Sequence, residues 1–307
     1  MTTTAPDLGA YWRTELASLR EYRKRAVDAT YPDWMPTKWQ SLRGLVDAVF
    51  AHCAAQGAPP RSAVELGCGS ATISIQLAQR GLTVTSVDRV PEALELAREC
   101  CEGLELPSLP NFVLSDFCTK YAPKPVERAD LVLSGGVIEH WDIEGQRIVL
   151  QTHLDLSERW VLLTVPNLES PVFQSFLRWA EASGRLYEDE HYEISTPGLA
   201  EHAGCEVAMV DGCRIFLPQA NHYVAGDSEL DDFCAELRSR LVAAGGPRYA
   251  SFPQICFTAA DMDVLQAVED AATASERMRF GFLHYYLLDS QPAQTPAEAA
   301  VGHRLQR

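Results

Sequence analysis

The sequence predicts an α/β protein built on a doubly wound, mostly parallel sheet of seven strands. Three observations point to this fold. Short apolar runs alternate regularly with helical patterns between residues 62 and 167. Residues 129–136 (ADLVLSGG) are almost continuously apolar, as expected of a strand buried on both faces. The chain has 307 residues, 47% of them hydrophobic, which is enough for one large domain with an accessory region.

The predicted elements follow a strand–helix rhythm. Residues 9–57 precede it and have a helical pattern, interrupted at the two prolines of residues 31–39 (YPDWMPTKW). Strands are expected at residues 62–67, 83–88, 112–116, 129–136 and 159–167, with helices at residues 70–81, 91–103 and 143–156. This order is typical of parallel strands joined by helical crossovers.

The rhythm changes after Pro166. Two helices and two strands are expected there, at residues 172–184, 195–204, 205–213 and 280–289, and residues 218–280 are mainly helical. We therefore expect an N-terminal helical cap region (1–60), a main domain (61–290) and a tail (291–307). A helical insert at about residues 218–280 would form a substrate cap on the main domain. The tail is rich in Ala, Pro and Gln and is expected to be poorly ordered.

Charge and cysteine usage limit the classes of function. Acidic residues outnumber basic ones by 42 to 26, giving a formal net charge of −16, and such a surface repels nucleic-acid phosphates. The basic cluster at residues 19–27 (LREYRKRAV) is expected to be a solvated helix face. No apolar run reaches the length of a membrane span, so a cytoplasmic protein without a membrane partner is expected. The nine scattered cysteines contain no C-x-x-C pair, which favours reduced thiols and no metal site.

The turn after the first strand, VELGCGSA (residues 64–71), is the strongest chemical signal. A dinucleotide fingerprint would need a third glycine at position 72, where the β-branched Thr72 stands. A phosphate-binding P-loop would need a lysine after the turn, and none follows. What remains is an acidic residue, Glu65, followed by Gly67, Gly69 and the small Ala71.

This arrangement resembles motif I of the class I S-adenosylmethionine-dependent methyltransferases, (D/E)-x-G-x-G-x-G, with Ala71 in place of the third glycine. The strand ends TSVD and LSDF continue the resemblance in the expected order. Residues 130–140 match D-x-V-x-x-x-x-V-(I/L)-E-H, a pattern of the small-molecule branch that includes ubiquinone-type enzymes. The resemblance covers residues 62–167 and implies a Rossmann-like fold with S-adenosylmethionine as cofactor.

The resemblance also implies roles for individual residues. The two glycines would let the backbone approach the methionine part of the cofactor, whose amino group Glu65 would reach through water or the turn backbone. Asp88 would accept hydrogen bonds from both ribose hydroxyls, Asp116 would lie near the adenine amino group, and Phe117 would lie against the ring. The expected cofactor contacts are Glu65, Gly67, Cys68, Gly69, Asp88, Arg89, Asp116, Phe117 and Gly135.

His140 is the leading candidate for a catalytic base, because the loop after the fourth strand faces the transferable methyl group in this fold. The alternative is that Glu139 and His140 cap the next helix or line the pocket. Trp141 stands beside His140, and the other candidate substrate contacts lie outside the alternating core. The candidate substrate contacts are Trp39, Trp141, Asn167 and Tyr192.

The predicted function is methyl transfer to an oxygen or nitrogen of a small-molecule metabolite, in a biosynthetic or tailoring pathway. A protein or peptide methyltransferase and a non-catalytic S-adenosylmethionine-binding protein stay open as alternatives. A nucleic-acid methyltransferase is disfavoured by the negative charge and by SGGV standing where (N/D)PP(Y/F) would be expected. The expected partner is a small-molecule substrate, and a homo-oligomer is left open.

Overall fold

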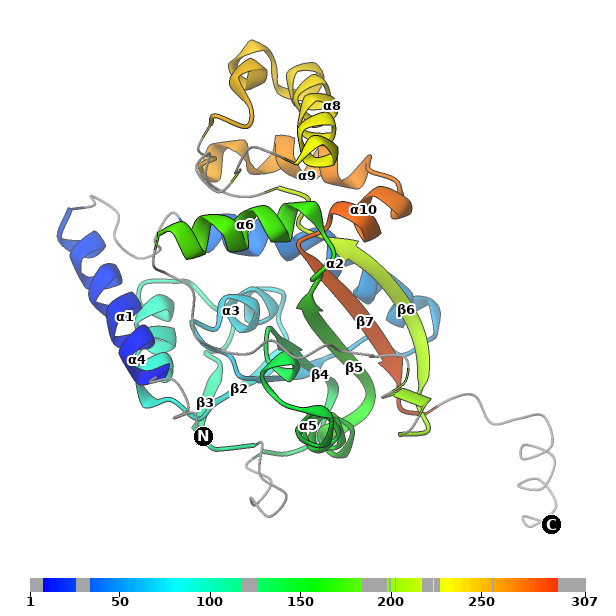
Figure 1. The fold of residues 1–307 in the computed structure, drawn as a ribbon. Helices are drawn as coiled ribbons and strands as arrows, with labels where there is room; N and C mark the ends of the chain where they lie inside the picture. The colour runs from blue at the N-terminus through cyan, green and yellow to red at the C-terminus, as the bar shows by residue number, and fades with distance from the viewer. Residues whose placement is uncertain are drawn as a thin grey trace, which may run out of the picture.

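The computed structural model describes residues 8–25, 34–117, 126–183, 198, 200–201, 203–216, 223, 227–255 and 257–291. Its centre is one seven-stranded sheet in the order β3-β2-β1-β4-β5-β7-β6 (Figure 1). The strands are β1 (Ser62–Leu66), β2 (Thr83–Asp88), β3 (Asn111–Leu114), β4 (Ala129–Gly135), β5 (Ser157–Pro166), β6 (Glu206–Cys213) and β7 (Leu283–Asp289). The first five strands of this order pair in parallel, and β7 runs antiparallel to both β5 and β6. The predicted doubly wound, mostly parallel sheet is confirmed.

Helices cover both faces of the sheet. The α-helices are α1 (Leu8–Arg25), α2 (Trp34–Ala55), α3 (Thr72–Gln79), α4 (Pro91–Cys101), α5 (Ile143–Leu156), α6 (Pro171–Ala182), α8 (Ser228–Gly245), α9 (Met262–Asp270) and α10 (Ala274–Phe280). On one face, Val49 of α2 and Leu77 of α3 pack against Leu131 of β4. On the other face, Val149 of α5 packs against Val161 of β5. The result is a helix–sheet–helix sandwich.

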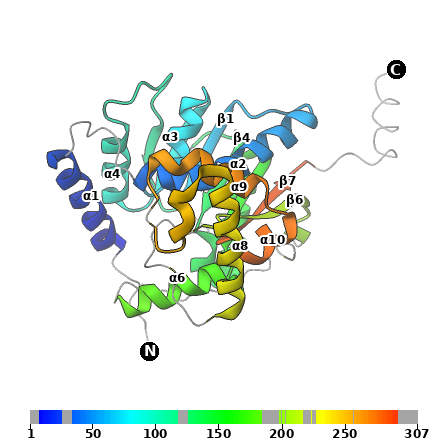
Figure 2. The same ribbon diagram turned by 90° about the horizontal axis from the view of Figure 1, so that it is seen from above.

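Residues 228–280, which we call the helical cap, contain α8, α9 and α10 together with the 3₁₀ turns η3 (Pro247–Ser251) and η4 (Ala259–Asp261). The cap has an apolar core of its own, in which Phe233 and Leu237 of α8 and Leu265 of α9 pack with Val172 of α6. Because α6 directly follows β5, the cap lies over the end of the sheet where the parallel strands finish (Figures 1 and 2).

Two expectations about the N-terminal helices need correction. Residues 34–39 do not interrupt the helical pattern, because α2 already begins at Trp34. Pro36 lies in the first turn, where a backbone N–H has no intrahelical partner and proline is tolerated. The basic cluster at residues 19–27 is also not simply solvated, since Arg20 and Arg23 form ion pairs with glutamates of α4.

Some expectations fall outside the described residues: most of the short helix at 195–204, and the tail beyond residue 291. The seven cysteines within the described ranges are free thiols. None of the helices that can be described is both long and apolar enough to cross a membrane. In the same part of the chain, no cluster of three or more His, Cys, Asp or Glu side chains could hold a metal ion.

Candidate functional site

The candidate site lies at the carboxyl ends of β2, β1 and β4. β1 pairs with β2 on one side and with β4 on the other, so the chain leaves the sheet in opposite directions around it. Open α/β sheets bind their ligands at such a switch point. The glycine turn follows β1 there, Asp88 is the last residue of β2, and the loop of residues 136–141 follows β4.

The glycine turn is held in an unusual backbone conformation. Gly67, Gly69 and Ala71 all have positive φ angles, of 70°, 53° and 54°. The backbone N–H groups of Gly67 and Cys68 both donate to the carbonyl oxygen of Val87 in β2, at 2.8 and 3.0 Å. Ala71 then serves as N-cap of α3, so the turn leads directly into the positive end of a helix.

Both glycines are also required by their surroundings. A Cβ on Gly67 would lie 2.6 Å from Cγ2 of Val137 and 3.6 Å from Cζ of Phe117. A Cβ on Gly69 would lie 2.5 Å from Cη2 of Trp12, a residue of α1. The turn is therefore lined by the β4 loop and Phe117 at one glycine and by the N-terminal helix at the other.

Asp88 ties the turn to β2. Its Oδ2 accepts a hydrogen bond from Gly69 N and its Oδ1 accepts one from Val90 N, both at 2.9 Å. Burial raises the pKa of Asp88 above its ordinary value, against the opposing effect of these backbone N–H groups. Each carboxylate oxygen has two acceptor positions, so this arrangement leaves acceptor capacity for further donors.

Glu65 in β1 stabilises the turn through hydrogen bonds to α3. Its Oε2 accepts hydrogen bonds from the backbone N–H and the hydroxyl of Ser74, in the first turn of α3. Ser86 in β2 donates in turn to the Ser74 hydroxyl at 2.7 Å. These bonds fix the start of α3 relative to β1 and β2, so Glu65 holds in place the two elements that the turn connects.

In the loop after β4, Glu139 is buried whereas the neighbouring His140 is exposed. Both belong to a 3₁₀ turn, η1 (Ile138–His140), which directs Glu139 inward and leaves His140 exposed. Glu139 is 2% exposed, and its Oε2 has no hydrogen-bond partner within the described part of the chain. Burial raises the pKa of Glu139 to about 8, although backbone N–H groups of Glu139 and Val137 oppose the shift.

The structure brings several predicted cofactor residues together. Phe117 is buried and reaches Gly67, as described above, while Asp116 beside it is exposed. Arg89 after β2 places its guanidinium 5.9 Å from the ring centroid of Trp141, which follows η1. Gly135 at the end of β4 faces β5, where an added Cβ would lie 2.9 Å from the hydroxyl of Thr164.

The predicted substrate residues are more scattered. Asn167 is buried, and its amide donates to the carbonyl oxygens of Met278 and Gly281 at 2.9 and 3.1 Å, between α10 and β7. Trp141 packs partly on the core beneath α5. The side chain of Trp39 and all of Tyr192 lie outside the described residues.

Sequence reasoning missed two features of this region. Trp12 comes from a helix that no cofactor motif includes, and only the fold brings it to Gly69. His153 of α5 is fully buried, with Nδ1 2.8 Å from Val149 O and Nε2 2.9 Å from the hydroxyl of Ser134 in β4. Burial lowers the pKa of His153 to about 4, so this pair joins α5 to β4 as neutral groups at neutral pH.

Comparison with known proteins identifies the segment that carries the site. Residues 64–152, from β1 to α5, match a family described as a methyltransferase domain. The comparison with curated proteins found no match.

Similar solved structures include magnesium protoporphyrin IX methyltransferase from Synechocystis PCC 6803 with bound SAH. It is 21% identical, with 57% of this chain and 77% of that chain covered and a TM-score of 0.43. A structure of the same enzyme with bound SAM is 22% identical, covering 68% and 91% of the two chains with a TM-score of 0.43. A putative methyltransferase in complex with the Haloferax volcanii Trm112 activator is 14% identical, covering 94% and 99% with a TM-score of 0.48.

Proposed function

The chain carries a class I S-adenosylmethionine-dependent methyltransferase domain, and from that premise we propose that the protein methylates an oxygen or nitrogen of a small molecule. The observation that carries the proposal is the hydrogen bond between the glycine turn and β2, in which Asp88 Oδ2 accepts the N–H of Gly69 at 2.9 Å. It places an acidic side chain and a glycine turn side by side at the switch point of the sheet.

The residues of the turn fit the cofactor. Positive φ angles at Gly67, Gly69 and Ala71 expose backbone rather than side chains at the start of α3. The helix N-terminus suits the methionine carboxylate, and Asp88 retains acceptor capacity for the ribose hydroxyls. Phe117 offers an apolar surface for the adenine ring, next to the exposed Asp116.

S-adenosylmethionine, when bound, supplies a methyl group already activated by the sulfonium. The residues of this chain have to hold the acceptor in line with that group and exclude water from it. In our proposal His140, exposed on η1, accepts the proton of a hydroxyl acceptor, and the helical cap with α6 holds the rest of the substrate. The contact between Arg89 and Trp141 joins the β2 and β4 loops, and in our proposal it borders the substrate.

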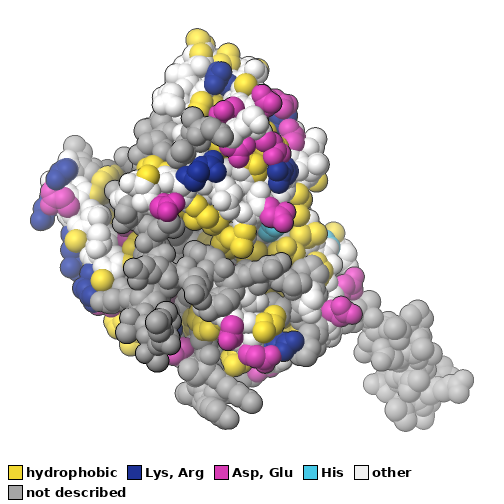
Figure 3. All heavy atoms as spheres, viewed as in Figure 1, with side chains coloured by type: hydrophobic (Ala, Val, Ile, Leu, Met, Phe, Trp, Pro, Cys, Tyr) yellow, Lys and Arg dark blue, Asp and Glu magenta, His cyan; other side chains and the backbone are white. Residues whose placement is uncertain are grey.

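Charge favours a small molecule over a nucleic acid as substrate. The formal net charge is −16. The helical cap exposes Asp231 and Asp232 on α8, and Figure 3 shows acidic side chains gathered on this part of the molecule with basic ones among them. A phosphate backbone approaching this face would meet repulsion.

Calorimetric titration with S-adenosylhomocysteine (SAH) tests the cofactor site. Asp88→Asn removes a charged acceptor for the ribose hydroxyls and should weaken SAH binding by about 1 to 3 kcal/mol. The matched control is Asp130→Asn, because the Asp130 carboxylate also accepts backbone N–H groups, from Arg61 and Ser62, but at the amino ends of the strands. Equal affinity of the Asp88 variant and the unchanged protein would contradict the proposed site.

Activity screening tests the reaction. Radiolabelled S-adenosylmethionine is offered with panels of phenols, amines and carboxylic acids, and with peptides as the competing class. His140→Ala should lower kcat on the active acceptor strongly while leaving SAH affinity unchanged. Tight SAH binding without turnover on any acceptor would favour a non-catalytic binding protein, and turnover on peptides alone would favour a protein methyltransferase.

A further inference from the structure

The N-terminal helix α1 packs against α4 with one face. Trp12, Leu16 and Leu19 recur at helical spacing on this face. Leu16 and Leu19 are buried in a cluster with Ile75 of α3 and Cys100 of α4. They are also the only buried side chains among residues 9–25, so α1 is held by a small apolar contact.

Trp12 extends this face onto the glycine turn. Its Cη2 and Cζ2 atoms lie 2.5 and 2.8 Å from the position that a Cβ on Gly69 would take. The indole therefore packs directly on the α-carbon of Gly69, whose N–H donates to Asp88. Trp12 and Asp88 thus contact the same residue of the proposed cofactor site.

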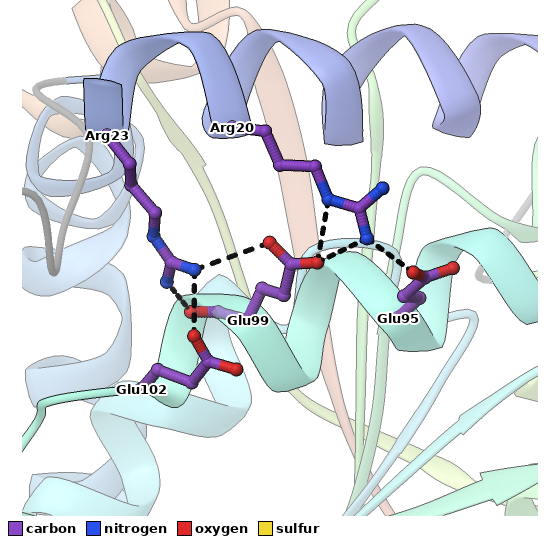
Figure 4. A network of polar contacts seen from close by, with 5 residues as sticks. All are labelled: Arg20, Arg23, Glu95, Glu99 and Glu102. Atoms are coloured by element: carbon purple, nitrogen blue, oxygen red, sulfur yellow. Dashed lines mark hydrogen bonds and ion pairs between the residues drawn. The ribbon is translucent and has the colours of Figure 1, made fainter. Parts of the chain in front are cut away.

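Ion pairs line the edge of the α1–α4 contact (Figure 4). Arg20 bonds to Glu95 and Glu99, and Arg23 bonds to Glu99 and Glu102. A further pair joins Arg13 to Glu92 at 2.6 Å. The Arg20 side chain is 49% exposed, so its pairs are open to screening by salt.

We propose that α1 is a lid on the cofactor site, and that Trp12 is the positioning residue that closes the pocket over Gly69. This inference rests on the cofactor binding proposed above. A helix held by two buried leucines and a row of ion pairs, of which those of Arg20 are exposed to salt, separates from the domain at lower cost than the central helices do. Cofactor enters and product leaves when α1 lifts, and the arginine–glutamate pairs set how often it does so.

The first test measures the dissociation rate of SAH from the full chain at 50 mM and 1 M NaCl. Arg20→Gln removes the pairs to Glu95 and Glu99 and should raise the rate roughly two- to fivefold at low salt. High salt should raise the rate of the unchanged protein and bring the two proteins together. The matched control is Arg25→Gln, because within the described residues Arg25 pairs with Glu21 of α1 itself. This variant should release SAH at the unchanged rate. Identical rates for the Arg20 variant and the unchanged protein at both salts would overturn the lid.

The second test uses Trp12. Trp12→Ala should raise the SAH dissociation rate about tenfold or more, because it opens the pocket at Gly69, and Trp12→Phe should restore most of the loss. Tighter SAH binding by the alanine variant would overturn the lid, since it would mean that the indole occupies the cofactor position instead of covering it. The unchanged protein separates the two proposals. If it fails to bind SAH, the proposed function fails; if it binds SAH and both variants behave like it, only the lid fails.

Discussion

At the end of β4, Glu139 carries a carboxyl group that is almost completely removed from water. Its Oε2 has no hydrogen-bond partner within the described residues, and burial raises its pKa from an ordinary 4.5 to about 8. The folded protein therefore holds a proton on Glu139 that the unfolded chain releases above pH 4.5. A group whose pKa rises on folding contributes its stability below the unfolded pKa and loses it as the pH rises through the folded value.

We predict that Glu139→Gln removes this pH dependence. Glutamine keeps the shape of the neutral carboxyl group and cannot ionise. The variant and the unchanged protein should have similar free energies of unfolding at pH 5, and the variant should be more stable at pH 9 by on the order of 3 kcal/mol. Urea denaturation of the cofactor-free proteins at both pH values measures the difference. A constant difference between the two proteins from pH 5 to pH 9 would show that Glu139 does not titrate in this window.

Ala71 shows what a sequence motif predicts about one residue and what only the structure explains. The sequence predicts a small side chain at the third glycine position of the family pattern. The structure adds the reason, since Ala71 is fully buried and has a left-handed backbone with φ 54° and ψ 30°. That conformation costs an L-residue about 1 to 2 kcal/mol, and glycine avoids the cost. A family pattern gives the residue type, whereas the strain becomes visible only in the backbone.

At the scale of elements, sequence patterns predicted most of the fold and missed where elements meet. Helix α5 (Ile143–Leu156) has the predicted bounds, because Asp142 caps its first turn and the apolar spacing is regular. The predicted start of α2 was wrong, because a proline in the first turn of a helix, such as Pro36, looks the same in sequence as a proline that interrupts one. The placement of β7 between β5 and β6 is set by long-range pairing, which local patterns do not encode.

The candidate site, too, could be predicted from the sequence only in part. The sequence predicted the residues on the loops after β1, β2 and β4, because each loop directly follows a recognisable strand. It could not place Trp12 on Gly69, because the contact joins residues far apart in the chain through the packing of α1 on α4. It also could not tell that Glu139 turns inward while His140 turns outward, since that depends on the geometry of η1.

The junction between α10 and β7 gives a prediction at this scale. The buried amide of Asn167 donates to Met278 O and Gly281 O, and Asn167 N donates to Phe282 O at 3.0 Å. Asn167→Ala leaves two carbonyl oxygens without this donor and should lower the free energy of unfolding by about 1 to 3 kcal/mol. Thermal denaturation measures the loss, and Asn111→Ala in β3, where the side chain is exposed, should have little effect. A higher KM for the acceptor without loss of stability would instead support a substrate contact.

Over the whole molecule, ion pairing neutralises the basic cluster that the sequence singles out. Residues 19–27 contain Arg20, Arg23, Lys24 and Arg25. The first two pair with glutamates of α4, and the other two pair with Glu21 on α1 itself. With a formal net charge of −16, the molecule therefore offers no net positive field from this helix to attract a nucleic acid.

We predict that the unchanged protein does not bind a duplex DNA or an RNA hairpin at 50 mM NaCl with a dissociation constant below about 0.1 mM. The double variant Glu95→Gln, Glu99→Gln frees Arg20 from both glutamates, leaves Arg23 its pair with Glu102, and removes two negative charges. If ion pairing is what prevents the basic cluster from binding nucleic acid, this variant should bind nucleic acid more tightly than the unchanged protein at 50 mM NaCl and lose that binding at 200 mM. Fluorescence anisotropy of labelled nucleic acids measures both proteins. Salt-sensitive binding by the unchanged protein would mean that a basic surface outside this helix outweighs the overall charge, and would reopen nucleic acid as a substrate class.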